Sequence, residues 1–170
     1  MTLTLLLVAM VVLTRAADAA KQTEAEEVNV VEKRGLLCSS GWTLYDWRCF
    51  QFVPRSLTWS AAEENCKSMN AHLVSVRSAE EYHHIQKMIA DQTHDYPTTW
   101  IGGTDSVKEG EWLWTDGSRF LFSYWCQGEP NNLGNQDCLV MNFSEKKCWD
   151  DQKCDKKKQS VCVKSWSLFG

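Results

Sequence analysis

The sequence predicts an α+β domain with two helices, short antiparallel sheets and one long irregular loop. Two segments with helical periodicity, 59–69 and 78–89, come early in the chain, and short apolar segments typical of strands surround and follow them. Helices that do not alternate regularly with strands are typical of the α+β class. All eight cysteines lie after residue 35, which indicates a domain crosslinked by disulfide bonds.

The N-terminal part of the chain is expected to be a targeting segment. Thr4–Leu13 is almost wholly apolar but shorter than the roughly 20 residues that cross a membrane. Ala17-Asp18-Ala19 has the small-x-small pattern of a cleavage site, so residues 1–19 are predicted to be a signal peptide and the protein to be secreted. Residues 20–34 end in Lys33-Arg34 and are either a propeptide cut after Arg34 or a flexible tail. Residues 35–170 have the length of one domain.

Composition excludes several classes of function. The net charge of −4 does not favour nucleic acid as a partner, and no other apolar segment approaches membrane length. The chain has no Cys-x-x-Cys motif, so the cysteines are expected to pair as disulfides rather than bind zinc. Eight cysteines allow about 105 pairings, and this count alone selects none of them. The even number leaves no obvious thiol for an interchain bridge, so a homo-oligomer of this chain would be non-covalent.

The first half of the domain reads as two strands, a helix and a strand. Residues 42–45 and 48–53 are predicted to be strands. Thr58 is a predicted N-cap for a helix over 59–69, in which Ala62, Cys66 and Met69 share a face. Residues 72–76 then alternate like a strand.

The second helix has the clearest local signal. Ser78 and Glu81 form a capping-box pattern, in which the serine oxygen accepts a free N–H and the glutamate returns to the cap. An apolar stripe follows, made of Tyr82, Ile85, Met88 and Ile89. His83 and His84 fall off this stripe. They are expected at the solvated surface rather than at a metal, because adjacent helix residues do not face one point.

The second half is rich in tryptophan and contains the long loop. Strands are predicted at residues 100–103 and 112–114, and again at 139–143, 147–149 and 160–166. From Asp116-Gly117 to about Gln136 little is periodic, and loops of this length are usually functional or disordered. Six tryptophans are expected in the core: Trp42, Trp59, Trp100, Trp112, Trp114 and Trp166. Trp125 and Trp149 are assigned to the core as well, with stacking on a sugar as the alternative.

Two triplets carry side chains suited to a hard cation. Glu129-Pro130-Asn131 and Trp149-Asp150-Asp151 offer carboxylate and amide oxygens, and calcium takes about six to eight oxygen ligands in proteins. No Ser-His-Asp order, Cys-His pair or glycine-rich phosphate loop stands in a convincing context, so an enzyme is not expected. Glu129 and Asp151 make a poor glycosidase pair, since carboxylates sharing a calcium ion are held ionised.

These motifs together resemble the C-type lectin-like domain family. The resemblance rests on Trp100-Ile101-Gly102-Gly103, on Trp112 to Gly117, and on the two triplets with Lys147-Cys148 before the second. It covers residue 38 to about residue 164 and is nearest to secreted fish lectins of the ladderlectin and nattectin kind and to type II antifreeze proteins. It implies the disulfides Cys38–Cys49, Cys66–Cys162 and Cys138–Cys154, which leaves Cys126 with Cys148.

The resemblance also implies a site and a cofactor. In the family the long loop binds Ca²⁺, and adjacent sugar hydroxyls complete the shell of the ion. The Glu-Pro bond is typically cis in the family, so the resemblance implies a cis Glu129–Pro130 bond. The metal ligands carried over by position are Glu129, Asn131, Gln136, Asp150 and Asp151. The first four of these would also contact the carbohydrate. A second metal site would use Asp105, Glu109 and Asp137, with a solvated acidic turn as the alternative interpretation.

Two of these positions depart from the family pattern. Gln136 stands where the family has Glu and Asp150 where it has Asn, which leaves the ligand charge at −3 but exchanges hydrogen-bond donor and acceptor. We therefore expected Gln136 to donate to a sugar hydroxyl and Asp150 to accept from it, with calcium binding preserved and sugar preference altered.

The function that this resemblance implies is binding without chemistry. We expect a secreted, calcium-dependent lectin for mannose-type glycans, since Glu-Pro-Asn goes with mannose, acting in innate defence on microbial surfaces. Ice binding by the same scaffold, as in type II antifreeze proteins, is the alternative. Asn142-Phe143-Ser144 is a sequon for N-glycosylation. Lys156, Lys157 and Lys158 form either a charged surface loop or a site for acidic glycans.

Overall fold

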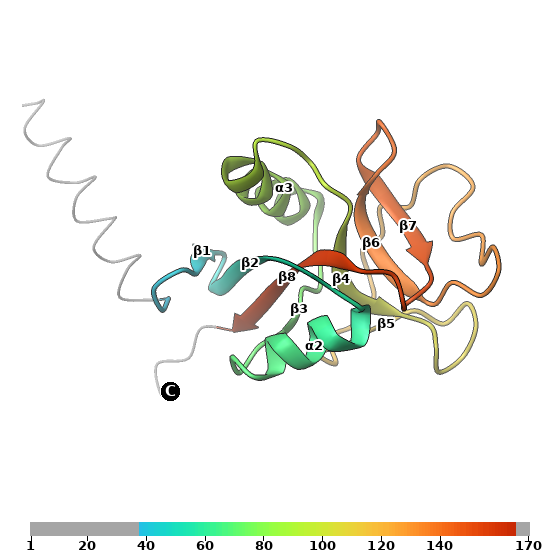
Figure 1. Cartoon of the computed structure of the whole chain (residues 1–170), viewed down its shortest axis with the longest axis horizontal. Helices are drawn as coiled ribbons and strands as arrows, with labels where there is room; N and C mark the ends of the chain where they lie inside the picture. The colour runs from blue at the N-terminus through green and yellow to red at the C-terminus, as the bar shows by residue number, and fades with distance from the viewer. Residues whose placement is uncertain (1–37, 166–170) are drawn as a thin grey trace, which may run out of the picture. The chain divides into compact units, whose positions relative to one another are not determined.

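The strands of the domain form one connected mixed sheet with a helix packed near each of its faces (Figure 1). The computed structural model describes residues 38–165, so the predicted signal peptide, the 20–34 segment and Trp166 lie outside the described residues. The strands are β1 (Thr43–Tyr45), β2 (Arg48–Leu57), β3 (His72–Leu73), β4 (Thr99–Thr104), β5 (Leu113–Trp114), β6 (Cys138–Phe143), β7 (Cys148–Gln152) and β8 (Lys158–Ser165). The helices are α2 (Trp59–Lys67) and α3 (Ala79–Thr93). Neither helix has the length and apolarity that a bilayer crossing requires.

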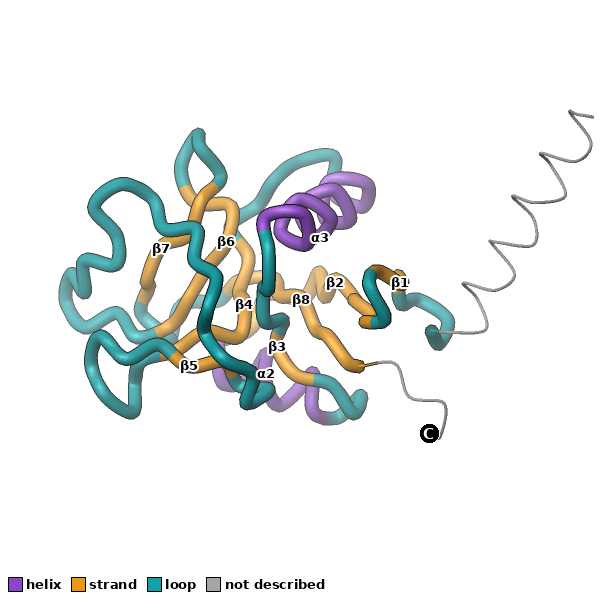
Figure 2. The backbone as a smooth tube through the Cα atoms, turned by 180° about the vertical axis from the view of Figure 1, so that it is seen from behind, coloured by secondary structure: helices purple, strands orange, loops and turns teal. Residues whose placement is uncertain are grey.

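The sheet is antiparallel at every pairing but one. The strand order is β1-β2-β8-β4-β6-β7, with β3 added to β8 and β5 added to β4. β4 and β8 run parallel, with Thr99 opposite Gln159, so the expected set of separate antiparallel sheets is a single mixed sheet instead. β2 pairs with β8 along most of its length, which extends it to Leu57 beyond the predicted end at residue 53. The long loop lies beyond β6 and β7, as the tube in Figure 2 shows.

Both predicted helix starts are confirmed. The Thr58 hydroxyl accepts from the Ala61 N–H at 3.4 Å and caps α2, whose buried face includes Ala62 and Cys66. The Ser78 hydroxyl accepts from the Glu81 N–H at 3.2 Å and caps α3. The whole predicted stripe of α3 is buried.

The predicted partner of Glu81 in the capping box is wrong, because its carboxylate does not return to the backbone N–H of Ser78. One carboxylate oxygen of Glu81 accepts from the N–H of Arg77 at 2.7 Å, and the other pairs with Arg48 at 2.6 Å. Arg48 also donates to the carbonyl and the hydroxyl of Ser75. Both side chains of the ion pair are almost fully buried, so α3 is tied to β2 by a charged contact inside the domain.

The histidines of α3 have different surroundings. His83 is exposed and contacts Gln86. His84 is partly buried and stacks on Tyr45, with ring centroids 4.3 Å apart. The prediction of a solvated surface therefore holds for His83 but not for His84, because β1 covers that side of the helix.

Three of the four implied disulfides are present as predicted: Cys66–Cys162, Cys126–Cys148 and Cys138–Cys154. Cys38 and Cys49 are also disulfide-bonded, and none of the described cysteines is free. Cys66–Cys162 joins α2 to β8, whereas the other two lie around the long loop and β7. The crosslinks therefore hold both the scaffold and the loop.

Seven of the tryptophans predicted for the core are buried or partly buried, whereas Trp47 is exposed. Trp100, Trp114 and Trp149 are buried. Four others are partly buried against the two clusters of core residues: Trp42, Trp59, Trp112 and Trp125. Gly102 and Gly103 allow this packing, because a Cβ atom on either would lie 2.5 Å from the Leu73 carbonyl oxygen or from the Leu139 side chain.

The asparagine of the sequon lies in the interior. Asn142 is 2% exposed at the end of β6. Its amide nitrogen donates to the Pro97 carbonyl at 3.3 Å, and its amide oxygen accepts from Gln86 at 3.0 Å. The side chain thus links β6 to α3 and to the segment before β4.

Replacing Arg48 by Met should lower the free energy of unfolding by about 3–5 kcal/mol, because Glu81 would remain as an unpaired buried charge. Arg48→Met/Glu81→Met should recover part of this loss. Urea unfolding followed by tryptophan fluorescence measures both. Lys87→Met is the matched control, since its ion pair with Asp91 is exposed and should contribute less than about 1 kcal/mol. A loss below about 1 kcal/mol in Arg48→Met would contradict the assignment.

Asn142 should carry no glycan in the folded protein, because attachment would remove its bond to Pro97 and require an exit through packed side chains. Protein from a glycosylating host should show no change in intact mass on treatment with a peptide N-glycosidase. Ser144→Ala, which abolishes the sequon, should differ from the native chain by one oxygen atom only. A larger difference would show that the sequon is used.

Candidate metal centre

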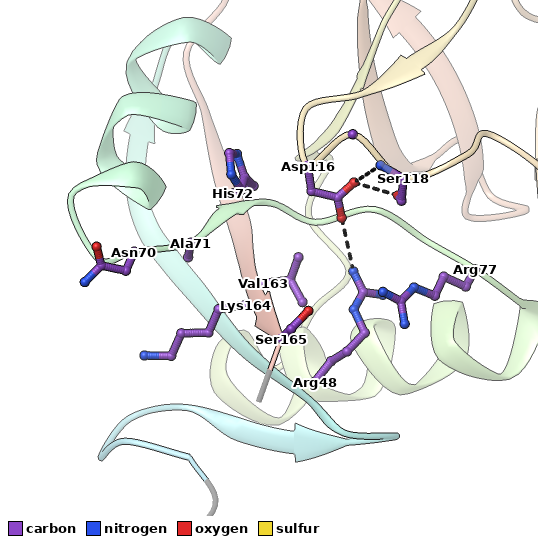
Figure 3. A pocket seen from close by; sticks show the side chains of 11 residues that line it. Arg48, Asn70, Ala71, His72, Arg77, Asp116, Ser118, Val163, Lys164 and Ser165 are labelled. Carbon is purple, nitrogen blue, oxygen red and sulfur yellow. Dashed lines mark hydrogen bonds and ion pairs between the residues drawn. The ribbon is translucent and has the colours of Figure 1, made fainter. Parts of the chain in front are cut away.

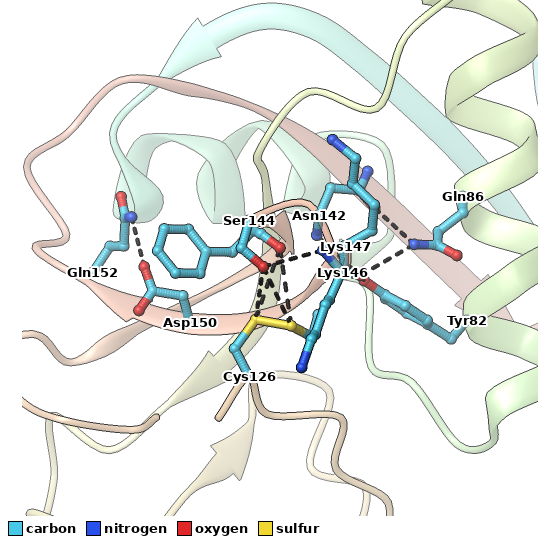
Figure 4. The surroundings of a disulfide bond; sticks show 11 residues. Tyr82, Gln86, Cys126, Asn142, Ser144, Lys146, Lys147, Asp150 and Gln152 are labelled. Carbon is cyan, nitrogen blue, oxygen red and sulfur yellow. Dashed lines mark hydrogen bonds between the residues drawn. A yellow bond between two sulfur atoms is a disulfide. The ribbon is translucent and has the colours of Figure 1, made fainter. Parts of the chain in front are cut away.

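The long loop is fastened to β7 by backbone pairing around Trp149. The Trp149 N–H donates to the Tyr124 carbonyl at 2.8 Å, and the Cys126 N–H donates to the Trp149 carbonyl at 2.9 Å. Cys126–Cys148 crosslinks the same two segments (Figure 4). Glu129 follows three residues after one cysteine, and Asp150 and Asp151 follow closely after the other, so the disulfide brings both triplets together.

The Trp149 side chain is packed among aromatic rings. Its indole is fully buried and meets five rings edge to face: Tyr82, Trp114, Phe120, Phe122 and Trp125. This cluster settles the position of Trp149 in the core. It holds the strand that carries Asp150 and Asp151 in place.

Three predicted ligands converge at this point. Glu129, Asp150 and Asp151 each offer an oxygen atom, and these atoms lie within 4.8 Å of one another. Asp150 and Asp151 are 4% and 1% exposed, and Glu129 is partly buried. Within residues 38–165 this is the only group of three or more acidic, histidine or cysteine side chains that converges in this way. The Glu129–Pro130 bond is cis, as the sequence led us to expect.

The loop tip is organised by Asp151. One of its carboxylate oxygens accepts from the Asn131 N–H at 3.0 Å, and the other accepts from the Asn132 N–H at 2.6 Å. The Asn131 amide oxygen accepts from the Leu133 N–H at 2.8 Å and so closes a turn at the tip. Asp151 therefore shapes the loop as well as facing the other carboxylates.

Gln136 is directed inward. Its amide nitrogen donates to the backbone carbonyl of Asp151 at 2.7 Å. Its amide oxygen is buried and accepts no hydrogen bond, and the same holds for Oε2 of Glu129. Buried oxygens without a donor are costly unless a cation or a ligand meets them. An all-oxygen set with two such atoms fits a calcium ion.

The site is electrostatically unfavourable without a cation. Burial raises the pKa of Glu129 to about 7, and repulsion from Asp150 and Asp151 acts in the same direction. Burial also raises the pKa of Asp150, while a hydrogen bond from Gln152 opposes that shift. A divalent cation would relieve both effects, because it compensates the charge that burial disfavours.

Asp150 has a partner that the sequence analysis did not identify. The Gln152 amide nitrogen donates to Oδ2 of Asp150 at 2.7 Å (Figure 4). The sequence predicts that Gln136 donates to a sugar hydroxyl and that Asp150 accepts from it. In the structure, both side chains already have hydrogen-bond partners within the protein. Two-residue spacing along a strand is the signal that could have revealed Gln152.

The three residues of the second predicted metal site, Asp105, Glu109 and Asp137, do not converge as the first group does. Asp105 is 3% exposed, and its Oδ2 accepts from the Gly110 N–H at 2.9 Å, while its Oδ1 accepts no hydrogen bond. The Asp137 carboxylate accepts from Asn135 at 3.0 Å. Burial and the charge of Asp137 raise the pKa of Asp105. Glu109 is exposed and its oxygens do not join a convergent group with the other two.

The three lysines after β7 have different surroundings. Lys156 and Lys157 are exposed, whereas Lys158 begins β8 and lies over the Trp100 ring at 5.5 Å. Burial lowers the pKa of Lys158, and attraction to Asp150 opposes this shift. Lys158 is therefore electrostatically linked to the carboxylate group.

A cavity of about 410 Å³ lies elsewhere on the domain (Figure 3). Its lining includes Arg48, His72, Arg77, Asp116 and Lys164. Asp116 accepts from the Ser118 hydroxyl at 2.6 Å and lies 3.7 Å from Arg48. None of the predicted metal or carbohydrate ligands lines this cavity.

Comparison with known proteins agrees with this architecture. Residues 55–164 match the family model of the lectin C-type domain. Ladderlectin from Oncorhynchus mykiss is 41% identical over 132 residues, which are 77% of this chain and 69% of the relative. The type-2 ice-structuring protein of Brachyopsis segaliensis is 37% identical over 171 residues, which are 97% and 98% of the two chains.

A solved structure has the same fold. The Ca²⁺-free form of a Ca²⁺-dependent type II antifreeze protein superimposes with a TM-score of 0.71 at 34% identity, over 75% of this chain and 100% of that one. The family match begins near the end of β2 and spans both helices, the long loop and β3 to β7. The chain belongs to the C-type lectin domain family, as a non-catalytic member.

Proposed function

We propose that this protein is a secreted, calcium-dependent lectin that binds mannose-type glycans. The convergence of Glu129, Asp150 and Asp151 within 4.8 Å carries this proposal, and the buried oxygens of Glu129 and Gln136 that lack a donor support it. Glu129, Gln136, Asp150 and Asp151 would hold the ion. When bound, calcium supplies open coordination positions to which two adjacent sugar hydroxyls can be attracted.

Residues of the loop and of β7 also hold the site in shape in this proposal. Asp151 fixes the loop tip through two backbone N–H groups, and the aromatic packing of Trp149 fixes β7. Glu129 and Asn131 flank the cis proline and would contact the sugar from the loop side. Binding at microbial surfaces in innate defence follows from the same proposal, and the disulfides suit an extracellular environment.

Ice binding is the second candidate. It is favoured by the similarity to a type-2 ice-structuring protein over nearly the whole chain. Sugar binding needs polar groups that converge on an ion, whereas ice binding needs a flatter and more regular surface. The Glu129-Pro130-Asn131 triplet favours the sugar. Thermal hysteresis of the purified protein distinguishes the two candidates.

The protein should be retained on mannan resin in millimolar calcium and be released by EDTA. Glu129→Gln should weaken calcium binding by about tenfold or more, because it removes one of three converging charges, and should abolish retention. Isothermal titration with calcium and elution profiles measure the two effects. Glu145→Gln, at an exposed site in the β6–β7 turn, is the matched control and should behave as the native chain. A folded, calcium-loaded protein that passes through mannan but binds galactosides would contradict the mannose assignment.

Calcium affinity should fall as pH falls below about 7, because protons compete with calcium for Glu129. The loss should be up to about tenfold per pH unit. Without calcium, in EDTA, the stability of the fold should change with pH in the opposite direction to the calcium affinity. A carboxyl group with a raised folded-state pKa stabilises the fold at acidic pH, and this contribution is lost as pH rises through about 7.

Calcium titrations at pH 5, 6, 7 and 8 test the first statement. Thermal unfolding in EDTA tests the second statement. The stability of the native chain is compared with that of Glu129→Gln at each pH, because the difference between them removes the contribution of the other titrating groups. The variant should gain in relative stability as pH rises from 5 to 8. An affinity for calcium that stays constant from pH 8 to pH 5 would refute the role of Glu129.

A further inference from the structure

We propose that Gln152 donates a hydrogen bond to the bound ligand and thereby sets specificity, while Asp150 serves the cation. This inference rests on the proposed function and adds a residue to its site. An asparagine could contribute both an oxygen to the ion and an N–H to the ligand. Here the carboxylate of Asp150 has no N–H, so the donor must come from another side chain. The structure places Gln152 in that position.

The geometry of β7 brings the two side chains to one face. Residues two apart in a strand point the same way, and Asp150 and Gln152 are so spaced within β7. The 2.7 Å hydrogen bond between the Gln152 amide nitrogen and Oδ2 of Asp150 confirms that they meet. Asp150 is buried and Gln152 is partly exposed, so the glutamine lies on the solvent side of the pair.

The amide of Gln152 can serve two partners at once. A side-chain amide nitrogen carries two N–H groups. One is used by Asp150, and within residues 38–165 no other acceptor of this amide nitrogen is found. The bond to Asp150 restrains the amide, and its second N–H remains for a ligand. A donor that is already oriented loses less conformational freedom on binding.

The other glutamine of the site is directed to the backbone of β7 rather than to a carboxylate. Gln136 donates to the Asp151 carbonyl, and its oxygen is buried. Glu129 and Asp151 only accept while they are ionised. The ligand is therefore expected to present a hydroxyl oxygen as an acceptor to Gln152, next to the oxygen that meets the ion. A sugar with two adjacent hydroxyls has this chemistry.

The backbone of Gln152 is also well held. It lies opposite Cys138 in the β6–β7 pairing, and Cys138 is crosslinked to Cys154, two residues after Gln152. Replacing the side chain should therefore leave the strand and the carboxylate group in place. This makes Gln152 suitable for a test that separates ligand contact from metal binding.

The test compares the native chain with Gln152→Met, which has similar length and no N–H donor. Calcium affinity from isothermal titration should change by less than about threefold. Inhibition of mannan retention by methyl α-mannoside should weaken by about three- to tenfold, the effect of one lost hydrogen bond. Gln127→Met, at an exposed glutamine of the long loop, is the control and should change neither value.

A series of monodeoxy mannosides identifies the contact. One analogue should bind the native chain less well than the parent sugar yet bind Gln152→Met as well as the parent does, because the variant has already lost that contact. If every analogue shows the same ratio in both proteins, Gln152 does not touch the sugar. If Gln152→Met loses calcium and sugar affinity together, Gln152 only positions Asp150 and the proposal is overturned.

The result for the native chain separates this inference from the proposed function. Failure of the calcium-loaded native chain to bind any mannoside would remove the proposed function and this inference with it. Equal retention of the native chain and Gln152→Met would overturn this inference alone and leave the lectin assignment standing.

Discussion

The long loop depends on its attachment to β7 at Trp149. A segment with no regular structure of its own can hold charged ligands only if its backbone is tied to the scaffold. Here two backbone hydrogen bonds, the Cys126–Cys148 disulfide and the buried indole of Trp149 act at one place. Glu129 on the loop and the two aspartates on the strand are brought together by this attachment.

At the carboxylate group, two departures from the family pattern, Gln136 and Asp150, change which side chains donate hydrogen bonds. Placing Asp at 150 and Gln at 136 keeps three negative charges among the ligands. It also changes where the donors are, because Gln136 turns to the Asp151 carbonyl and Gln152 turns to Asp150. The electrostatic cost is visible in the raised pKa values of Glu129 and Asp150. This balance fits the proposed function, in which a cation would offset the negative charge of the site.

Local sequence signals predicted the elements that local physics controls. The caps at Thr58 and Ser78 and the stripe of α3 follow from spacing within a few residues, and the burial of Trp149 follows from the cost of exposing a large aromatic side chain. The partner of Glu81 did not, because Arg48 lies 33 residues earlier and meets it only after β2 and α3 pack together. The direction of the Gln136 amide was also missed, since it depends on a backbone carbonyl in β7. Side-chain identity indicated the metal ligands, and tertiary contacts decided what each one does.

The pairing of β2 with β8 has a consequence for how the domain can be displayed. Arg48 lies opposite Ser165, so the segments that lead into β2 and out of β8 meet on neighbouring strands. β7 and the loop lie at the other end of the strand order (Figure 1). A stalk, a second copy or a reporter attached directly after Ser165 would therefore start on a strand separated from β7 by β4 and β6. Several such domains tethered by these ends could engage a repeating glycan surface together, and the strength of attachment would then be set by valency and spacing rather than by a single weak contact.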